Sequence, residues 1–130
     1  MQKPFWKGSR LLEIFILLCI LGVLTLLTVP YFKQFQCRSR QSEARMELTN
    51  LYQAEKLYHA THQRYADLET LGKLGLIMMK GKYYSFEIIQ IKENSFHINA
   101  LAQKKSFTKL DSWSIDQTGQ LKHLQNACPN

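Results

Sequence analysis

Acidic residues are scarce in this sequence of 130 residues, which holds 10 Asp and Glu against 17 Lys and Arg. The resulting formal net charge of +7 suits contact with anionic surfaces, although it does not identify one. Three cysteines are too few for a scaffold held by several disulfides. Apolar residues make up 45% and charged residues 21%, which excludes a disordered or collagen-like chain. The length allows one domain.

Motifs that carry enzymatic chemistry are also missing. The sequence has no phosphate-binding glycine loop, no CxxC pair and no convincing nucleophile–base set. Asp111 and Asp116 are interpreted as turn residues rather than as catalytic carboxylates. His59 and His62, with Glu55 one turn earlier, have a spacing that can bind a metal, but three ligands without a fourth are a weak signal. We interpret them as a solvated helix face and predict neither enzymatic activity nor a cofactor.

Charge is absent from Ile14 to Phe32, a run of 19 residues. As a helix this run would be about 28 Å long, close to the bilayer core of about 30 Å. A core helix of a small soluble domain would show a polar face, and this run shows almost none. The alternative is a cleaved secretory signal, but the usual apolar stretch there is only ~7–15 residues long and ends at a small-residue cleavage site. The sequence therefore predicts a retained membrane helix.

The orientation of this helix is not given by charge, because basic residues flank it almost equally on both sides. Those residues are Lys3, Lys7 and Arg10 before the run, and Lys33, Arg38 and Arg40 after it. Only a short segment precedes the run, so a translocated C-terminal domain is the natural interpretation.

Glu13 is the one acidic residue beside the apolar run, with Leu12 before it and Ile14 after it. An ionisable side chain inside a membrane costs roughly 2.5–3.5 kcal/mol on insertion scales, which makes Glu13 a functional hypothesis. The alternative is that Glu13 reaches the headgroup boundary or pairs with Arg10, three residues before it. Both interpretations stay open at this point.

The N-terminal residues form a second pattern: a short basic leader ending at Gly8, then Ser9-Arg10-Leu11-Leu12-Glu13, then the apolar run. This pattern resembles the processing site of type IV prepilins and the related pseudopilins. In that family a dedicated peptidase cuts after the glycine, and the fifth mature residue is a glutamate, here Glu13. Gly22 and Pro30 also stand where family members usually carry a glycine and a proline. Ser9 and Arg10 depart from the usual Phe and Thr, which keeps a minor or pseudopilin subunit open beside the main building block.

The resemblance implies a role for each matched residue. Cleavage between Gly8 and Ser9 would free an amine on Ser9, which family members methylate. The amine of an incoming subunit would neutralise Glu13 of its neighbour and set the register of assembly. Gly22 and Pro30 would be weak points at which the helix unwinds. For these two residues a plain proline kink in a membrane helix is the alternative.

A helical pattern continues from Arg38 to about Gln63. The apolar residues expected on one side are Ala44, Leu48, Leu51, Ala54, Leu57 and Tyr58. The charged residues expected on the remaining surface are Glu43, Arg45, Glu47, Glu55, Lys56 and Arg64. This pattern predicts one long helix whose outer half packs on a small domain.

Beyond the helix, residues 65–79 read as a loop with one short helix at most, and the apolar period then changes to two. Alternating residues predict strands around 84–88, 96–102, 113–115 and 121–124, with turns at 93–94 and 117–119. We expect three or four antiparallel strands with one apolar face. The resemblance implies an α+β fold in which the outer half of the long N-terminal helix packs on this sheet.

The expected organisation has four segments: a leader at 1–8, the membrane and assembly half of the helix at 9–36, its amphipathic outer half at 37–64, and a loop-and-sheet part at 65–130. Cys19 lies in the apolar run and is interpreted as a packing residue. Cys37 and Cys128 would both face an oxidising compartment if the domain is exported. A bond between them, free thiols and pairing between chains stay open.

The function implied by the resemblance is that of a structural subunit. A prepilin peptidase would process it, the inner membrane would hold it by a single pass with the C-terminal domain outside the cytoplasm, and pilus or secretion machinery would polymerise it with itself or other pilins. The product would be a cell-surface pilus or a periplasmic pseudopilus, for adhesion, motility, DNA uptake or secretion. Alternatives are a minor pilin, a type II secretion pseudopilin, and, from another class, a single-pass anchored binding or sensor domain that does not polymerise.

The basic excess adds one further hypothesis. The lysines near expected strand ends and loops are Lys80, Lys82, Lys104, Lys105, Lys109 and Lys122. If they gather on one surface, they could contact DNA or another anionic surface. Scattered solubilising charge is the favoured interpretation from sequence.

Overall fold

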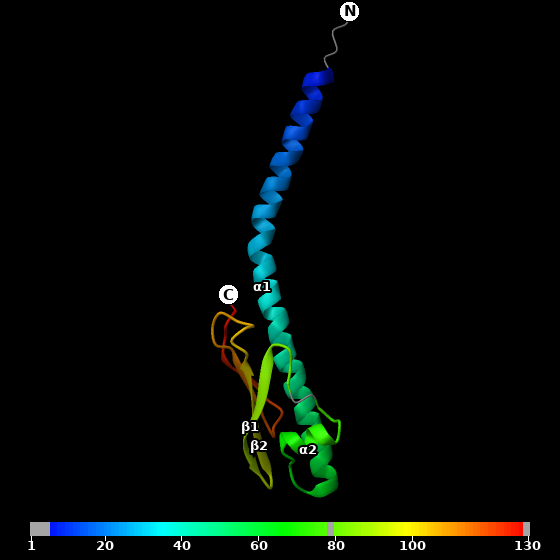
Figure 1. Cartoon of the computed structure of the whole chain (residues 1–130), viewed down its shortest axis with the longest axis vertical. Coiled ribbons are helices and arrows are strands. Elements are labelled where there is room, and N and C mark those ends of the chain that lie inside the picture. The colour runs from blue at the N-terminus through cyan, green and yellow to red at the C-terminus, as the bar shows by residue number, and fades with distance from the viewer. Residues whose placement is uncertain (1–5, 78–79, 129–130) are drawn as a thin grey trace, which may run out of the picture. The chain divides into compact units, whose positions relative to one another are not determined.

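The computed structural model describes residues 6–77 and 80–128. Its helices are α1 (Trp6–His62) and α2 (Leu68–Lys73), and its strands are β1 (Tyr84–Lys92), β2 (Ser95–Ala102), β3 (Ser112–Asp116) and β4 (Leu121–Gln125) (Figure 1). The chain divides into two compact units, residues 1–35 and residues 36–130, and α1 contributes to both. Each unit is described by itself below, as unit 1 and unit 2.

Unit 1 consists of the first part of α1, and its apolar side chains are exposed. The large apolar side chains from Leu11 to Phe35 have exposed fractions between 48% and 77%. α1 is the one helix in the described chain that is long and apolar enough to cross a membrane, by length and composition alone, and its most apolar window has a mean hydropathy of 2.7. Pro30 lies inside the helix.

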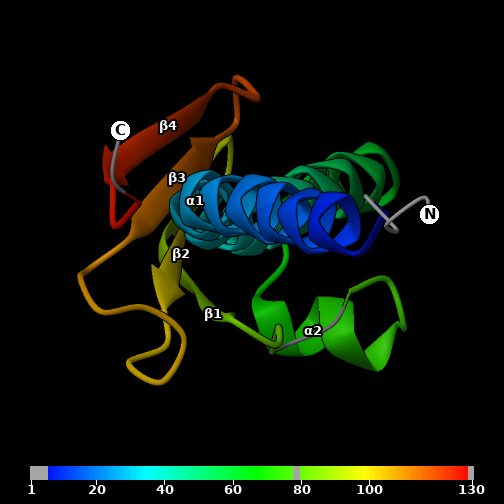
Figure 2. The same cartoon turned by 90° about the horizontal axis from the view of Figure 1, so that it is seen from above.

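Unit 2 contains a four-stranded antiparallel sheet in the order β1-β2-β3-β4. Ile98 on β2 lies opposite Ile88 on β1 and opposite Ile115 on β3. A bulge interrupts the β1–β2 ladder between Ile88 and Gln90. The unit-2 part of α1 lies across one face of this sheet (Figure 2).

The core of unit 2 forms between that helix and that sheet face. Leu48 and Leu51 from α1 pack with Phe96, Ile98 and Ile115 from the strands, and all five are almost fully buried. The expected fold of a long N-terminal helix on a small antiparallel sheet is confirmed. Alternating side chains on β2 supply the sheet's half of the core, as a period of two requires.

Two residues of the expected helix pattern were predicted on the wrong side of α1: Leu57 on the packed side and Glu55 on the remaining surface. Leu57 is 60% exposed, whereas Glu55 is fully buried. At about 100° per residue, Glu55 lies only about 20° around the helix from the direction of Ala44, and Leu57 lies about 140° away. The helix geometry, and not the polarity of the side chain, decided which residue faces the sheet.

The expected turns and the short helix are present. β1 ends at Lys92 and β2 begins at Ser95, and Gly119 in the β3–β4 turn has a φ of +78°, which glycine adopts without strain. α2 begins after Asp67, whose side chain accepts a hydrogen bond from the backbone N–H of Thr70 at 2.6 Å. One expectation was wrong: all five residues of β4 are exposed, so the apolar face of the sheet does not extend onto this edge strand.

Candidate functional site

The predicted assembly residues Gly8, Ser9, Glu13 and Gly22 lie on the exposed surface of α1 in unit 1. Glu13 and Arg10 form no ion pair, although both are among the described residues. The hydroxyl of Thr25 donates a hydrogen bond to the backbone oxygen of Gly22 at 2.8 Å within the helix. The roles implied for these residues remain predictions.

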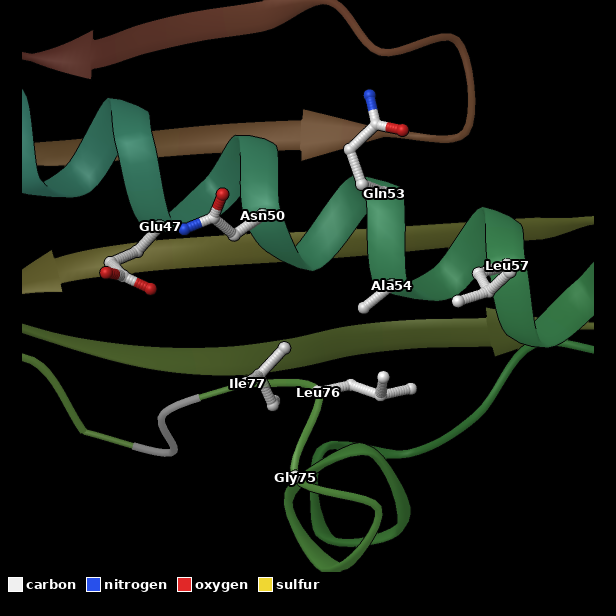
Figure 3. A pocket seen from close by; sticks show the side chains of 8 residues that line it. All are labelled: Glu47, Asn50, Gln53, Ala54, Leu57, Gly75, Leu76 and Ile77. Atoms are coloured by element: carbon white, nitrogen blue, oxygen red, sulfur yellow. The ribbon is translucent and has the colours of Figure 1, made fainter.

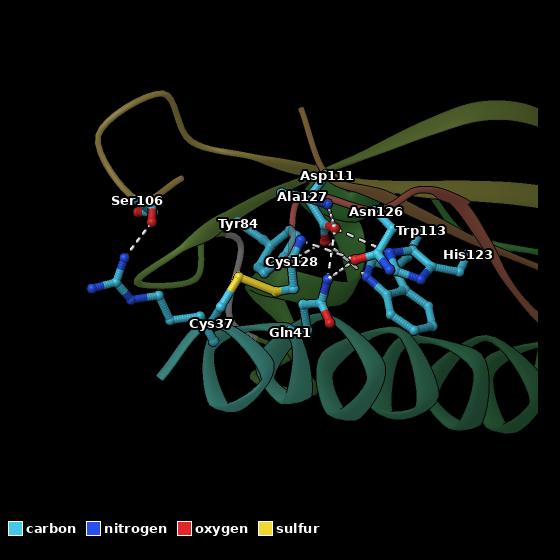
Figure 4. The surroundings of a disulfide bond; sticks show 11 residues. Cys37, Gln41, Tyr84, Ser106, Asp111, Trp113, His123, Asn126, Ala127 and Cys128 are labelled. Atoms are coloured by element: carbon cyan, nitrogen blue, oxygen red, sulfur yellow. Dashed lines mark hydrogen bonds and ion pairs between the residues drawn. A yellow bond between two sulfur atoms is a disulfide. The ribbon is translucent and has the colours of Figure 1, made fainter. Parts of the chain in front are cut away.

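Cys37 and Cys128 form a disulfide in unit 2 (Figure 4). The two residues are 91 positions apart in the sequence, and their Cα atoms are 5.7 Å apart. Of the three alternatives left open by the sequence, the structure contains the bond within the chain. The bond ties the C-terminal segment to α1. Cys19 is a free cysteine in the described chain.

A buried carboxylate lies beside this disulfide. Asp111 is 1% exposed, and its two oxygens are surrounded by donors from α1, β1, β3, β4 and the C-terminal segment (Figure 4). The partners of this Asp111 cluster are Gln41 Nε2 at 2.8 Å, the Ala127 N–H at 2.9 Å, His123 Nε2 at 3.0 Å, Trp113 Nε1 at 3.0 Å and the Tyr84 hydroxyl. The interpretation of Asp111 as a turn residue was therefore wrong.

The electrostatics of the Asp111 cluster keep its carboxylate charged. Burial alone would raise the pKa of Asp111, but the hydrogen bonds it accepts from Tyr84, the Ala127 N–H, His123 and Gln41 outweigh burial and lower that pKa. Burial and the neighbouring Asp111 raise the pKa of Tyr84, which therefore stays protonated as a donor. The Asp111 carboxylate is therefore a fixed acceptor site, and its exposed partner is His123 on β4.

Sequence reasoning missed the Asp111 cluster because its partners are far apart in the chain, from Gln41 to Ala127. An aspartate directly before a strand has the local signature of a turn residue. The interpretation as a turn residue is correct for Asp116, the last residue of β3, because it accepts a hydrogen bond from the Thr118 N–H at 2.9 Å in the β3–β4 turn.

The interpretation of Glu55, His59 and His62 as a solvated face holds for His62, which is exposed, but not for Glu55, while His59 is half-buried. Glu55 is fully buried and accepts a hydrogen bond from the Ala66 N–H at 2.9 Å. Burial raises the pKa of Glu55 to about 7, even though the Ala66 N–H acts in the opposite direction. His59 stacks on Tyr65, and no group of three metal-binding side chains is found among the described residues.

Four of the lysines singled out in the sequence lie on two neighbouring segments, and Tyr83 belongs to one of them. The Gln103 N–H donates to the Tyr83 oxygen at 2.9 Å and Gln103 Nε2 donates to the Gly81 oxygen at 3.0 Å, which holds the segments 80–83 and 103–106 side by side. The members of this Tyr83 patch are Arg40, Lys80, Lys82, Tyr83, Lys104 and Lys105.

Cations lie close to the aromatic ring of this patch. Arg40 Cζ is 5.4 Å and Lys82 Nζ is 5.1 Å from the centre of the Tyr83 ring. Arg40 also donates to the backbone oxygen of Ser106, which fixes the 103–106 segment. Lys122 is not part of the patch, because it lies on β4 with its Nζ 3.8 Å from Asp116.

A protein-family model described as "Type IV minor pilin ComP, DNA uptake sequence receptor" matches residues 30–112 of this chain. The chain belongs to this family of type IV pilins. The match includes the Tyr83 patch and Asp111, and it ends before β4 and Cys128.

Two curated pilins are similar in sequence. The type IV major pilin protein PilA of Myxococcus xanthus (strain DK1622) is 34% identical over 86 residues, which are 66% of this chain and 38% of that protein. The type IV major pilin protein PilE of Neisseria gonorrhoeae is 27% identical over 122 residues, 89% of this chain and 71% of that protein. The chain thus spans less than half the length of the Myxococcus relative.

A solved pilin has the same fold. The Neisseria meningitidis non-core minor pilin PilV superposes with a TM-score of 0.59 and 18% identity, over 75% of this chain and 97% of that chain. Pilins are structural proteins, so this pilin is a structural subunit and not an enzyme. Membership of the type IV pilin family also accounts for the long apolar helix that precedes the sheet in the chain.

Proposed function

We propose that this pilin is first held in the inner membrane and then polymerised into a fibre. Prepilin peptidase cuts between Gly8 and Ser9, residues 9–36 span the membrane once, and residues 37–130 lie outside the cytoplasm. The observation that carries the proposal is the apolar surface of unit 1, whose large side chains are 48% to 77% exposed. Such a surface needs lipid, or the helices of other subunits, around it.

Glu13 sets the register of assembly in this proposal. A carboxylate in apolar surroundings needs a cation, and cleavage after Gly8 supplies one as the α-amine of Ser9, which is then methylated. The amine of an incoming subunit pairs with Glu13 of its neighbour. Gly22 and Pro30 weaken the helix between them, which lets the fibre stretch there.

The intact mass of the protein from native membranes tests the first step. Loss of residues 1–8, with one added methyl group, is the expected result. Fibres sheared from cells should then contain the processed chain. A retained leader together with absence from the sheared fraction would support the alternative of an anchored binding or sensor domain that does not polymerise.

The matched family model favours a minor pilin over a type II secretion pseudopilin, while both curated relatives are major pilins. The amount of this chain in purified fibres, measured against the other pilins present, separates the two pilin alternatives. A main building block would be the most abundant protein of the fibre.

A second candidate function is contact with DNA through the Tyr83 patch. Two observations favour it over scattered charge. The matched family model is described as a DNA uptake sequence receptor. Within the matched range, Arg40 and Lys82 lie over the Tyr83 ring, and the other three lysines of the patch lie on the same two hydrogen-bonded segments. Cations grouped in this way can neutralise neighbouring phosphates of a duplex.

Fluorescence anisotropy of labelled duplex DNA with the full chain in detergent micelles tests this candidate. Changing Lys80, Lys82, Lys104 and Lys105 to Gln should weaken binding at least tenfold at moderate salt and flatten the dependence of log Kd on log salt. The matched control changes Lys56, Lys73, Lys92 and Lys122 to Gln, with the same loss of net charge. Equal losses in the two variants would assign the binding to net charge and contradict a role for the patch.

A further inference from the structure

A groove of about 480 Å³ runs along unit 2 between α1 and the segment after α2 (Figure 3). Leu76 and Ile77 point toward Ala54 and Leu57 across it, and Glu47 lies at one end. Leu57 is 60% and Leu76 is 39% exposed, so the apolar walls of the groove are open to solvent. The remaining lining residues are Asn50, Gln53 and Gly75.

The same unit carries a protruding apolar side chain elsewhere. Leu110, in the loop between β2 and β3, is 70% exposed, the highest value among the large apolar side chains of the described part of unit 2. The next residue, Asp111, is held by the cluster described above, and its backbone oxygen accepts a hydrogen bond from the Ala102 N–H at 2.9 Å. Leu110 is therefore an exposed apolar residue on a rigid base.

Charge distinguishes the groove from this loop. Among the described residues that line the groove, Glu47 is charged and none is basic. Lys109, directly before Leu110, is exposed. A Leu110 side chain that enters the groove can thus bring the Lys109 ammonium toward the Glu47 carboxylate, so the loop and the groove complement each other in polarity and in charge.

The two surfaces lie at different levels of unit 2 within one subunit. Asp111 contacts α1 at Gln41, whereas the groove runs along α1 from Glu47 to Leu57, about 9 to 24 Å further at 1.5 Å per residue. Figure 1 shows the β2–β3 loop at one end of the sheet and α2 at the other. Two different surfaces at separate ends are what a head-to-tail contact needs in order to repeat without closing into a ring.

We propose that the groove binds the Lys109–Leu110 loop of a second copy of this chain. This inference rests on the proposed function, since it requires neighbouring copies in a fibre. Leu110 fills the apolar part of the groove, and Lys109 pairs with Glu47 at its end. The contact joins the globular parts of neighbouring subunits independently of Glu13.

Cysteine pairs test the contact in the full chain. Two differently tagged copies are expressed together, one with Leu57→Cys and the other with Leu110→Cys, and sheared fibres are treated with a mild oxidant. A disulfide-linked dimer that carries both tags is expected. Each variant alone controls for Cys19, and Leu124→Cys, 52% exposed on β4, replaces Leu110→Cys as a position outside the contact.

A charge exchange tests the same contact without new cysteines. Glu47→Lys and Lys109→Glu should each lower the amount of the chain in sheared fibres at least fivefold, and the double variant should restore it. Glu87→Lys and Lys92→Glu, both at exposed positions of β1 outside the contact, should leave it unchanged.

The outcomes separate the two proposals. Fibres that contain both tagged copies but give no mixed dimer, or a double variant that is not rescued, would overturn the groove contact and leave the proposed function standing. Absence of the unmodified chain from the sheared fraction would overturn the proposed function, and the groove contact with it.

Discussion

Asp111 gathers the polar contacts that hold the C-terminal segment of unit 2 to α1. Its donors come from α1, from three of the four strands and from Ala127, next to the disulfide. Hydrogen bonds to a charged acceptor are about twice as strong as neutral ones, and donors buried without an acceptor are costly. One side chain thus controls whether β4 and the residues after it stay in place.

Asp111→Ala should lower the free energy of unfolding by about 3–5 kcal/mol, because several buried donors lose their acceptor. Asp116→Ala, in the exposed turn, should cost about 1 kcal/mol. Thermal unfolding of the full chain in detergent micelles measures both. Because the folded pKa of Asp111 is lowered, its contribution is present at neutral pH and is lost as the pH falls below about 4. An equal effect of the two variants would contradict a special role for Asp111.

Glu55 should make stability depend on pH in the opposite sense. Its folded pKa is about 7 against an ordinary value of 4.5, so the folded state favours the protonated carboxyl. The contribution to stability is complete below pH 4.5 and is lost as the pH rises to 7, by about 3 kcal/mol in all.

Glu55→Gln should remove this dependence and stabilise the folded chain at pH 8, because no charge is then buried at position 55. The measurement is the unfolding midpoint between pH 4 and pH 8. Glu87→Gln, at an exposed position of β1, is the control and should leave the pH profile unchanged. An unchanged profile in Glu55→Gln would contradict the assigned burial effect.

At the level of helices and strands, hydrophobic periodicity predicted the correct elements but not which residues of each element are buried. The four strands, both turns and the helical stripe of Ala44, Leu48 and Leu51 followed from alternation and helical spacing. β4 did not, because Leu121 and Leu124 look like core residues while the edge strand leaves them exposed. Burial on an edge strand depends on which neighbour covers it, and a single chain's sequence does not contain that information.

The pairing of Cys37 with Cys128 could not be determined from the spacing of the cysteines in the sequence. Cys37 lies near the start of the unit-2 helix and Cys128 lies after β4, so their pairing depends on the position of the Asp111 cluster between them. Closing a loop of 91 positions removes chain entropy worth about 4–5 kcal/mol from the unfolded state.

Changing Cys37 and Cys128 together to Ser should therefore lower the unfolding midpoint, and amide exchange at residues 121–128 should speed up most. Hydrogen exchange by mass spectrometry measures both the local and the global effect. Cys19→Ser is the control, since Cys19 is free. A reductant should lower the midpoint of the unmodified chain and leave the double variant unchanged; an effect on both would contradict the assignment.

For the molecule as a whole, the two units have opposite surface chemistry. Unit 1 exposes apolar side chains along its helix, whereas unit 2 buries a core and exposes basic residues around Tyr83. The sequence alone indicated the apolar helix and the family, the latter because the leader, Glu13, Gly22 and Pro30 occur together. It did not reveal the groove or the neighbouring position of the two segments that carry the patch lysines, because both depend on contacts between distant parts of the chain.

Glu13 is where the chemistry of the whole assembly can be tested. The structure leaves its carboxylate exposed on an apolar helix and without an ion pair to Arg10, so in an apolar environment its charge requires a partner from outside its own helix. Glu13→Gln keeps the shape of the side chain and removes the charge. The variant should be inserted and processed normally, but its amount in sheared fibres should fall at least tenfold.

Glu87→Gln, with the same change of net charge in unit 2, should assemble normally. Quantitative immunoblots of membrane and fibre fractions measure both steps. Normal assembly of Glu13→Gln would contradict the proposal that pairing between Glu13 and the Ser9 amine of a neighbour is needed for assembly. A loss already in the membrane fraction would place the role of Glu13 in insertion or processing.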